Sequence, residues 1–121
     1  MNISARALER IRDRPALYIG TESLIRLQAF IQGYSLALSD EQVPVGDGGS
    51  GFTEFSLWLS LQFRYPTEWG YVESLTAANG GNDQLAFRDF WKWREIFLSE
   101  PKRCVLDYLA EHESRRQAQS D

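Results

Sequence analysis

Apolar residues recur at intervals of three and four along most of this chain, which is the spacing of one face of an α-helix. The longest such segment lies between Leu24 and Leu38, where the apolar positions form one broad stripe. Shorter segments with the same spacing cover residues 3–13, residues 83–98 and the region after Pro101. The pattern therefore predicts an all-α fold, a compact single-domain bundle of about five to six helices.

The segment from Phe52 to Phe63 fits two structures. Its apolar residues alternate as they would in a strand, and they also recur at helical spacing. Twelve residues is long for a strand. We therefore predict a helix here and keep a strand at 52–63, within an α+β fold, as the alternative.

Proline and glycine mark where the predicted helices end. Arg14 precedes Pro15 and is disfavoured in the α region, so the first helix should stop at this point. The following corner is predicted to be non-helical, with at least two of the apolar residues 17–19 buried. Gly20 should take a positive φ. Gly33 lies inside the second helix, where close packing against a neighbouring helix would explain it.

Two segments are not predicted to form helices. Residues 39–51 are rich in glycine and contain Pro44, which is typical of a loop. From about His112 onward the chain becomes polar. We therefore expect one helical domain over residues 1–112 and a polar, frayed tail over residues 113–121.

Length and composition restrict the class of protein. A chain of 121 residues with 43% apolar residues and sixteen aromatic residues can bury a core as one domain. Its single cysteine, Cys104, excludes an internal disulfide and suits a reducing compartment. The N-terminal region lacks a long apolar run. These features lead us to expect a cytoplasmic protein without a membrane segment.

The net charge of −4 is distributed unevenly along the chain. Residues 1–26 contain five arginines against three acidic residues, whereas residues 38–100 contain ten acidic residues against four basic ones. An acidic surface repels the phosphates of nucleic acids, so we do not expect nucleic-acid binding. It would favour a protein partner with a basic surface. A solvated surface that only maintains solubility is the simpler interpretation.

Residues that could catalyse a reaction or bind a metal are few and scattered. His112 is the only histidine, and no second ligand lies near it at metal-binding spacing. Cys104 lies among apolar residues of the last predicted helix and is expected to be a buried, inert thiol. Asp40 and Glu41 are interpreted as a solvated turn rather than an acid–base pair. We therefore predict no catalytic residue, no metal site, no cofactor and no enzymatic activity.

Trp69 and Tyr71 are the best candidates for exposed aromatic residues. They lie beside Glu68 and Glu73, so the four residues could form an aromatic–acidic patch. Aromatic side chains commonly anchor protein interfaces. Packing of the aromatic rings in the core is the alternative.

Two short motifs resemble those of gyrase-type ATPases. DGGSG at residues 47–51 matches the D-x-G-x-G pattern, and RPALYIG at residues 14–20 is similar to the RPxMYIG segment of their N-terminal domain. The helix that follows lacks the acidic and asparagine residues with which those enzymes hold water and Mg²⁺. The chain is also too short for the sandwich and lid that enclose ATP. A small nucleotide-binding protein is kept as an alternative function.

A longer set of segments resembles the small bacterial immunity proteins encoded beside polymorphic toxins, including toxins on Rhs-type carriers. The strongest part is the pattern R-P-x-x-Y-I-G…S-L…L-x-x-F-I-x-G-Y, which runs from Arg14 to Tyr34. FTEFSLWLSLQF, WGYVESL and FRDFWKWREIF extend the resemblance over residues 8–98. It implies a role in interbacterial competition: binding a cognate toxin domain and blocking its active site or substrate surface. A general protein-interaction adaptor is a further alternative.

The resemblance implies that Arg14, Pro15, Tyr18 and Gly20 are structural and that exposed positions make the toxin contacts. We selected the expected contact residues for their charge and expected exposure. They are Asp40, Glu41, Asp47, Glu54, Glu68, Trp69, Glu73, Asp83 and Asp89.

Overall fold

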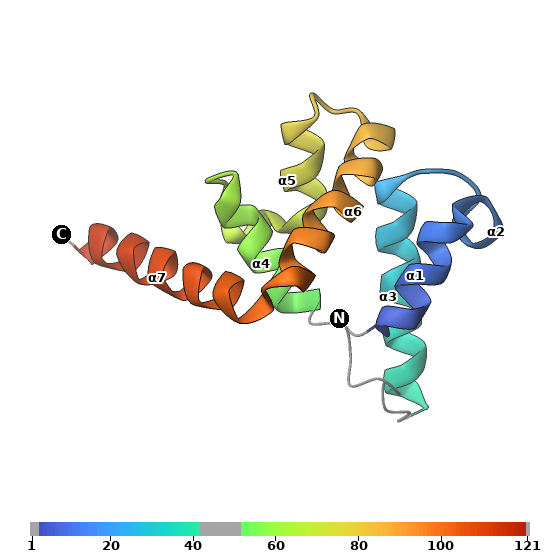
Figure 1. Ribbon diagram of the computed structural model, residues 1–121, viewed down its shortest axis with the longest axis horizontal. Coiled ribbons are helices and arrows are strands. Elements are labelled where there is room, and N and C mark those ends of the chain that lie inside the picture. The colour runs from blue at the N-terminus through green and yellow to red at the C-terminus, as the bar shows by residue number, and fades with distance from the viewer. Residues whose placement is uncertain (1–2, 42–51, 121) are drawn as a thin grey trace.

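The computed structural model describes residues 3–41 and 52–120, which form seven α-helices and one short 3₁₀ helix and contain no strand within these ranges. The elements are α1 (Ala5–Asp13), α2 (Pro15–Ile19), α3 (Leu24–Asp40), α4 (Phe52–Gln62), η1 (Thr67–Trp69), α5 (Gly70–Ala78), α6 (Asp83–Ser99) and α7 (Pro101–Ser120) (Figure 1). The predicted all-α fold is confirmed. The predicted loop at 39–51 lies mostly outside the described residues.

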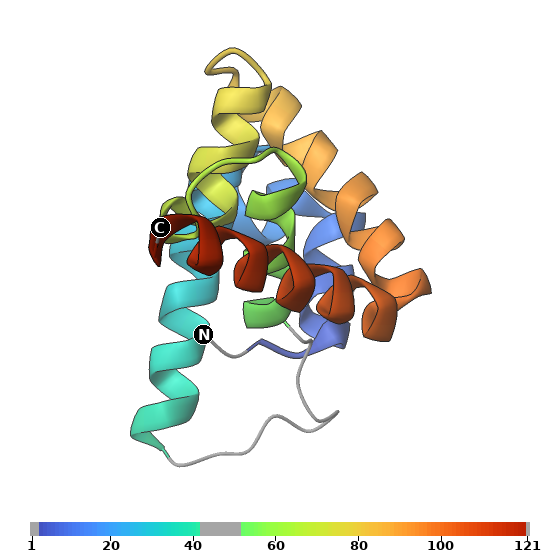
Figure 2. The same cartoon turned by 90° about the vertical axis from the view of Figure 1, so that its left-hand side faces the viewer.

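Helix α6 lies in the middle of the molecule (Figure 1). It contacts α3, α4, α5 and α7. Helices α1, α2 and α3 lie on one side of α6, and α4, α5 and α7 lie on the other (Figure 1). Figure 2 shows α7 crossing over α4, its main neighbour. Within the described ranges, no helix combines the length and the apolarity that a membrane span requires.

The core is aromatic where α4, α5 and α6 meet. Phe52 and Phe55 of α4, Tyr71 of α5 and Phe90 of α6 are all buried. The ring centroids of their contacting pairs lie between 4.9 and 6.2 Å apart. Helical spacing brings both phenylalanines of α4 to this side of the helix. The helix predicted near residues 52–63 is therefore confirmed, and the strand alternative is wrong.

One polar pair lies inside this core. The hydroxyl oxygens of Ser60 on α4 and Ser74 on α5 are 3.1 Å apart, and neither residue is exposed. The Ser60 hydroxyl also lies 3.3 Å from the backbone oxygen of Ser56. A buried hydroxyl without a partner destabilises a fold. The pairing removes that cost for both serines.

The corner after Arg14 differs from the prediction. Residues Pro15–Ile19 form the short helix α2, because the fixed φ of proline suits the first turn of a helix. Of the three apolar residues expected to be mostly buried, only Ile19 is; Leu17 is 67% and Tyr18 is 40% exposed. The corner therefore presents apolar side chains on the surface.

Gly20 ends α2 with a φ of 88°, the positive value expected. A Cβ at this position would lie 2.5 Å from Nη1 of Arg26, which donates a hydrogen bond to the backbone oxygen of Ile19 at 3.2 Å. Glycine is favoured here because other residues are strained at this φ, and a Cβ would also force the guanidinium to move. At Gly33, in contrast, an added Cβ would meet no described atom within 4 Å. Its predicted packing against a neighbouring helix of the same chain is wrong.

The last helix also differs from the prediction. Helix α7 continues to Ser120, where the sequence predicted a frayed tail over residues 113–121. Ion pairs one turn apart support its polar second half: Glu111 with Arg115 at 3.6 Å, and Glu113 with Arg116 at 3.1 Å. Such pairs stabilise an exposed helix that has few apolar contacts.

Candidate protein-binding surface

The residues predicted to bind a partner lie on several separate elements, and Asp47 lies outside the described residues. Asp40 and Glu41 at the end of α3 and Glu54 in the first turn of α4 are exposed. The end of α3 and helix α5 occupy different parts of the molecule (Figure 1). The predicted set therefore does not form one continuous surface.

Asp83 and Asp89 are half-buried and bonded to other parts of the fold. One carboxylate oxygen of Asp83 accepts a hydrogen bond from the backbone N–H of Ile25 at 3.0 Å, and the other accepts one from the hydroxyl of Ser23. Asp89 accepts a hydrogen bond from Nδ2 of Asn79 at 3.2 Å. These bonds give both carboxylates a structural role, and their contact with a partner stays a prediction.

Glu68, Trp69 and Glu73 do lie together, in η1 and the first turn of α5, and all three are exposed. The Trp69 side chain is 40% exposed, and its ring centroid lies 4.9 Å from that of the half-buried Tyr65. We call Tyr65, Glu68, Trp69 and Glu73 the aromatic–acidic patch. Tyr71, which was expected to share it, is buried against Phe52 instead.

Helix α7 helps to hold the aromatic–acidic patch in place. Nη1 of Arg115 donates a hydrogen bond to the backbone oxygen of Tyr65 at 3.2 Å. The backbone N–H of Trp69 donates to the backbone oxygen of Pro66 at 3.1 Å. These backbone bonds at Tyr65 and Trp69 restrict the motion of the two contacting rings. A restricted ring loses less conformational entropy when a partner binds.

The turn before the patch contains Arg64, the one described non-glycine residue with a positive φ, at 60°. The N–H of Tyr65 donates to the oxygen of Ser60 at 3.0 Å, and the N–H of Arg64 donates to the oxygen of Leu61 at 3.1 Å. This is a Schellman helix ending, in which the position of Arg64 usually holds glycine. Non-glycine residues in such strained conformations concentrate at functional sites.

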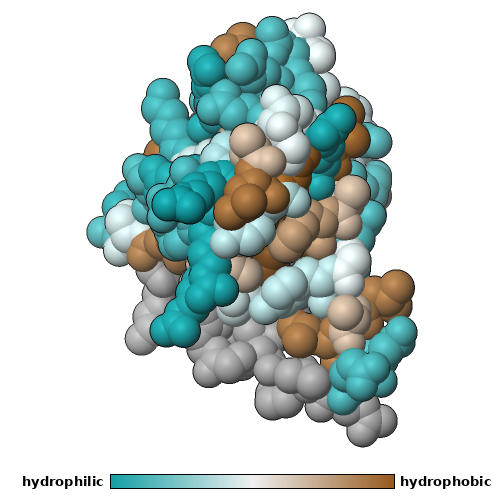
Figure 3. Space-filling view, turned by 90° about the vertical axis from the view of Figure 1, so that its right-hand side faces the viewer, coloured by the Kyte–Doolittle hydropathy of each residue, from teal (hydrophilic) through white to brown (hydrophobic). Residues whose placement is uncertain are grey.

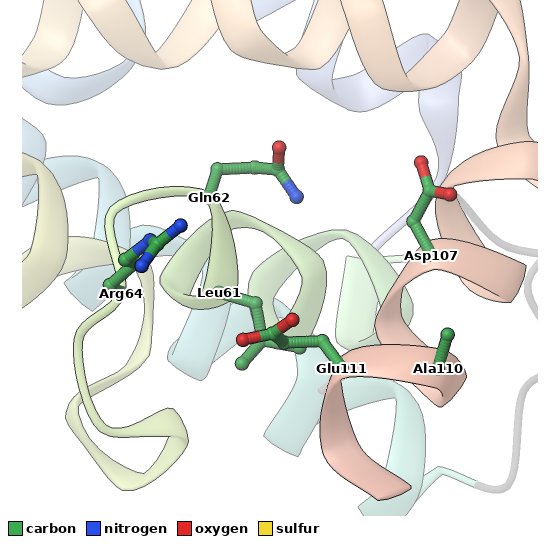
Figure 4. A pocket seen from close by; sticks show the side chains of 6 residues that line it. All are labelled: Leu61, Gln62, Arg64, Asp107, Ala110 and Glu111. Atoms are coloured by element: carbon green, nitrogen blue, oxygen red, sulfur yellow. The ribbon is translucent and has the colours of Figure 1, made fainter. Parts of the chain in front are cut away.

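Arg64 also lines a cleft of about 450 Å³ between α4 and α7. Its lining consists of Leu61, Gln62, Arg64, Asp107, Ala110 and Glu111 (Figure 4). Figure 4 shows Gln62 and Glu111 extending into the space between the two helices. Asp107 and Glu111 are four residues apart, so they lie on the same face of α7. The cleft can therefore accept hydrogen bonds from a basic side chain.

Sequence reasoning missed Arg64, Asp107 and Glu111. The helix stop before Pro66 and the spacing of the two acids on one helix are the only signals that the sequence contains for them. Among the described residues, no group of three or more His, Cys, Asp or Glu side chains could hold a metal ion. The side chain of His112 lies outside the described part of the structure.

Burial shifts the pKa of three groups in the interior. It raises the pKa of the Tyr71 phenol and of the Cys104 thiol, and it lowers the pKa of the Arg94 guanidinium. Cys104 is buried, as predicted. Arg94 is also buried, with its guanidinium carbon 5.6 Å from the centre of the Phe55 ring. All three side chains take part in packing.

The turn from Arg64 to Tyr65 joins the cleft to the aromatic–acidic patch, so the two features adjoin. Together they are the candidate protein-binding surface. Comparisons with protein-family models, with curated protein sequences and with solved structures find no match for this chain.

Proposed function

We propose that this protein is an immunity protein, which binds a cognate antibacterial toxin domain and blocks its active site or its substrate surface. The observation that carries the proposal is the aromatic–acidic patch, where Trp69 is 40% exposed and in tilted ring contact with Tyr65 beside the exposed Glu68 and Glu73. The resemblance of residues 8–98 to immunity proteins supports the choice of a toxin as the partner.

The patch has the chemistry of an interface anchor. A tryptophan ring held against a tyrosine offers a large, rigid apolar area, and tryptophan and tyrosine are enriched among residues that dominate binding energy. The carboxylates of Glu68 and Glu73 attract a basic partner and speed its association. The net charge of −4 acts in the same direction over longer distances.

A toxin that acts on a phosphate-bearing substrate needs a basic surface to hold it. Such a surface is complementary to the patch and to the acidic side of the α4–α7 cleft. In this arrangement Trp69 packs against the toxin, while Asp107 and Glu111 accept hydrogen bonds from one of its basic side chains. The contact occupies the surface that the toxin's substrate would use.

Co-expression tests the proposal. A cell that makes the toxin domain encoded beside this chain's gene should stop growing, and the wild-type chain should restore growth. Trp69→Ala should weaken binding to a purified, catalytically inactive toxin roughly thirtyfold, because the loss of a central aromatic anchor costs about 2 kcal/mol. Glu73→Lys should slow association, and stopped-flow or surface-binding kinetics would measure the rate.

Asp13→Lys is the matched control for Glu73→Lys, since it makes the same charge change at an exposed position on α1. It should leave association and growth rescue close to wild type. If the wild-type chain neither binds nor rescues, the function is wrong. If Trp69→Ala and Glu73→Lys bind as wild type does, the interface lies elsewhere.

The nucleotide-binding alternative has no support in the described residues. The glycine-rich motif at 47–51 lies outside them, and most of RPALYIG forms the surface helix α2. A general adaptor would use the same aromatic–acidic patch and differs only in its partner.

A further inference from the structure

The outward face of α3 is apolar, whereas the exposed face of a surface helix is usually charged. Residues 27–39 contain no charged side chain. Ile25 and Leu36 are 58% and 63% exposed on this side of the helix. Figure 3 shows hydrophobic residues gathered in a band on this side of the molecule. We define the outward face of α3 as Arg26, Ala29, Gly33, Leu36, Ala37 and Asp40, all of which are exposed.

Among the described residues, the second half of this helix contributes less to the buried core than the first half does. Its buried residues, Leu24, Leu27 and Ile31, all lie in the first half. From Gln32 to Asp40 every residue is exposed or half-buried. Figures 1 and 2 both show this half extending beyond the other helices. Tyr34 packs against the core, but this half contributes no fully buried side chain, so a second surface would add to its stability.

The charges at the ends of this face are placed symmetrically about Gly33. Arg26 lies seven residues before it and Asp40 seven residues after it, while Ala29 and Ala37 lie four residues to either side. Steps of three and four residues keep these positions on one face of the helix. At a rise of 1.5 Å per residue, each charge is about 10 Å from Gly33 along the helix axis.

This symmetry makes the face complementary to itself. When two copies of α3 lie antiparallel with a twofold axis at Gly33, Arg26 of each copy faces Asp40 of the other, and Ala29 faces Ala37. In a parallel pair, Arg26 would instead face Arg26 and Asp40 would face Asp40, so like charges would repel each other. Closed dimers use this type of interface, in which both copies contribute the same surface.

Gly33 suits the centre of such a contact. Within the described part of the chain nothing requires glycine there, although glycine costs about 1 kcal/mol relative to alanine inside a helix. Facing glycines let two helix axes approach to about 8 Å. The exposed Ile25 and Leu36 flank this crossing point, where association would bury them.

The two charges also lack partners of opposite sign within the described part of the chain. None of the ion pairs formed there includes Arg26 or Asp40. One N–H of Arg26 donates to the backbone oxygen of Ile19, which leaves its remaining N–H groups and its charge for another partner.

We propose that two copies of this chain associate through the outward face of α3, antiparallel about Gly33, with two ion pairs between Arg26 and Asp40. The inference does not depend on the proposed function, because the aromatic–acidic patch lies on other elements. It assigns Asp40 to the contact between copies rather than to the toxin contact.

Sedimentation equilibrium of the full chain over a range of concentrations tests the proposal. The mass should rise from 13.9 kDa toward twice that value as concentration increases. Gly33→Leu should weaken association at least about tenfold, because the new side chains hold the helices apart. Ser39→Leu is the matched control, since Ser39 is exposed on the same helix about a third of a turn away from Gly33. It should leave association unchanged.

A charge exchange tests the orientation. Arg26→Asp alone and Asp40→Arg alone each create two pairs of like charge, so each variant should remain monomeric. An equimolar mixture should associate, because both contacts then join opposite charges. Since Arg26→Asp also removes the bond to Ile19, thermal unfolding must confirm that it folds; if it does not, Gly33→Leu decides the question alone.

Three results would overturn the proposal. The wild-type mass could stay at 13.9 kDa at the highest concentration tested. Gly33→Leu could associate as wild type does, or the mixture of the two folded charge variants could remain monomeric.

Discussion

The carboxylate of Asp83 accepts a hydrogen bond from the backbone N–H of Ile25 at 3.0 Å and thereby joins the first turns of α6 and α3. Its second oxygen bonds to the hydroxyl of Ser23, whose oxygen caps α3 through the N–H of Arg26 at 3.2 Å. The N-terminus of a helix carries a partial positive charge. One carboxylate therefore stabilises two helices that are distant in sequence.

Asp83→Ala should lower the free energy of unfolding by about 1 to 2 kcal/mol, because the N-terminus of α3 loses a charged acceptor and the first turn of α6 loses a favourable negative charge. Asp83→Asn should lose less, since it keeps an acceptor oxygen. Urea unfolding at pH 7, followed by circular dichroism, measures both. Asp13→Ala, at an exposed site in the last turn of α1, is the control and should change little. Wild-type stability of Asp83→Ala would contradict this role of the carboxylate.

Gly20→Ala should lower the free energy of unfolding by about 2 kcal/mol. Alanine resists the φ of 88°, and its Cβ would displace the Arg26 guanidinium from the oxygen of Ile19. Gly33→Ala makes the same chemical change in open space. In dilute solution, where chains do not associate, it should raise stability by up to about 1 kcal/mol. Equal effects of the two substitutions would refute this account of Gly20.

Arg64→Gly should raise the free energy of unfolding by about 1 kcal/mol, because glycine adopts a φ of 60° without the steric cost that arginine has there. Arg64→Ala removes the guanidinium but keeps a Cβ, so it should gain little. Thermal unfolding compares the three proteins. If Arg64 contributes to the candidate protein-binding surface, the more stable glycine variant should bind the toxin less tightly.

Tyr71→Phe should keep or raise stability at pH 7, by up to about 1 kcal/mol, because the Tyr71 hydroxyl is buried without a partner among the described residues. Burial raises the pKa of Tyr71 above its ordinary value of 10.0. Above pH 10 the unfolded state therefore loses this proton before the folded state does, and wild-type stability falls as the pH rises.

Tyr71→Phe lacks this titrating group. The difference between its free energy of unfolding and that of wild type should therefore increase above pH 10, by at most about 1.4 kcal/mol per pH unit. Urea unfolding at about pH 9 and about pH 11 measures the difference. Tyr18→Phe, at an exposed site, is the control for removing a hydroxyl that is not buried. If the difference in free energy of unfolding between Tyr71→Phe and wild type were the same at both pH values, burial would not raise the pKa of the Tyr71 phenol.

The sequence predicted most helices because each has an apolar face of regular period. It missed α2, because the same Arg14–Pro15 junction that ends one helix also starts the next. It wrongly predicted that Gly33 packs against a neighbouring helix of this chain, since a glycine inside a helix indicates close packing without showing what packs there. The continuation of α7 to Ser120 depends on ion pairs between side chains, which apolar periodicity does not reveal.

The candidate site was predictable only in part. Glu68 and Trp69 are exposed as expected, whereas Tyr71 is buried because Gly70, with a φ of 78°, redirects the chain between them. The bonds of Asp83 depend on which helix lies beside α6. The conformation of Arg64 depends on how α4 ends, and a helix ending without glycine leaves no clear mark in the sequence.

The hydroxyl contact between Ser60 and Ser74 has a consequence for the uniqueness of this fold. Helix α4 is apolar on several sides, so it could turn about its own axis and still cover hydrophobic surface in many orientations. In nearly all of them the Ser74 hydroxyl would lose this partner and face hydrocarbon, whereas Ser60 would keep its bond to the oxygen of Ser56. The contact thus selects a single rotational setting of α4 and so determines where the exposed turn after it emerges.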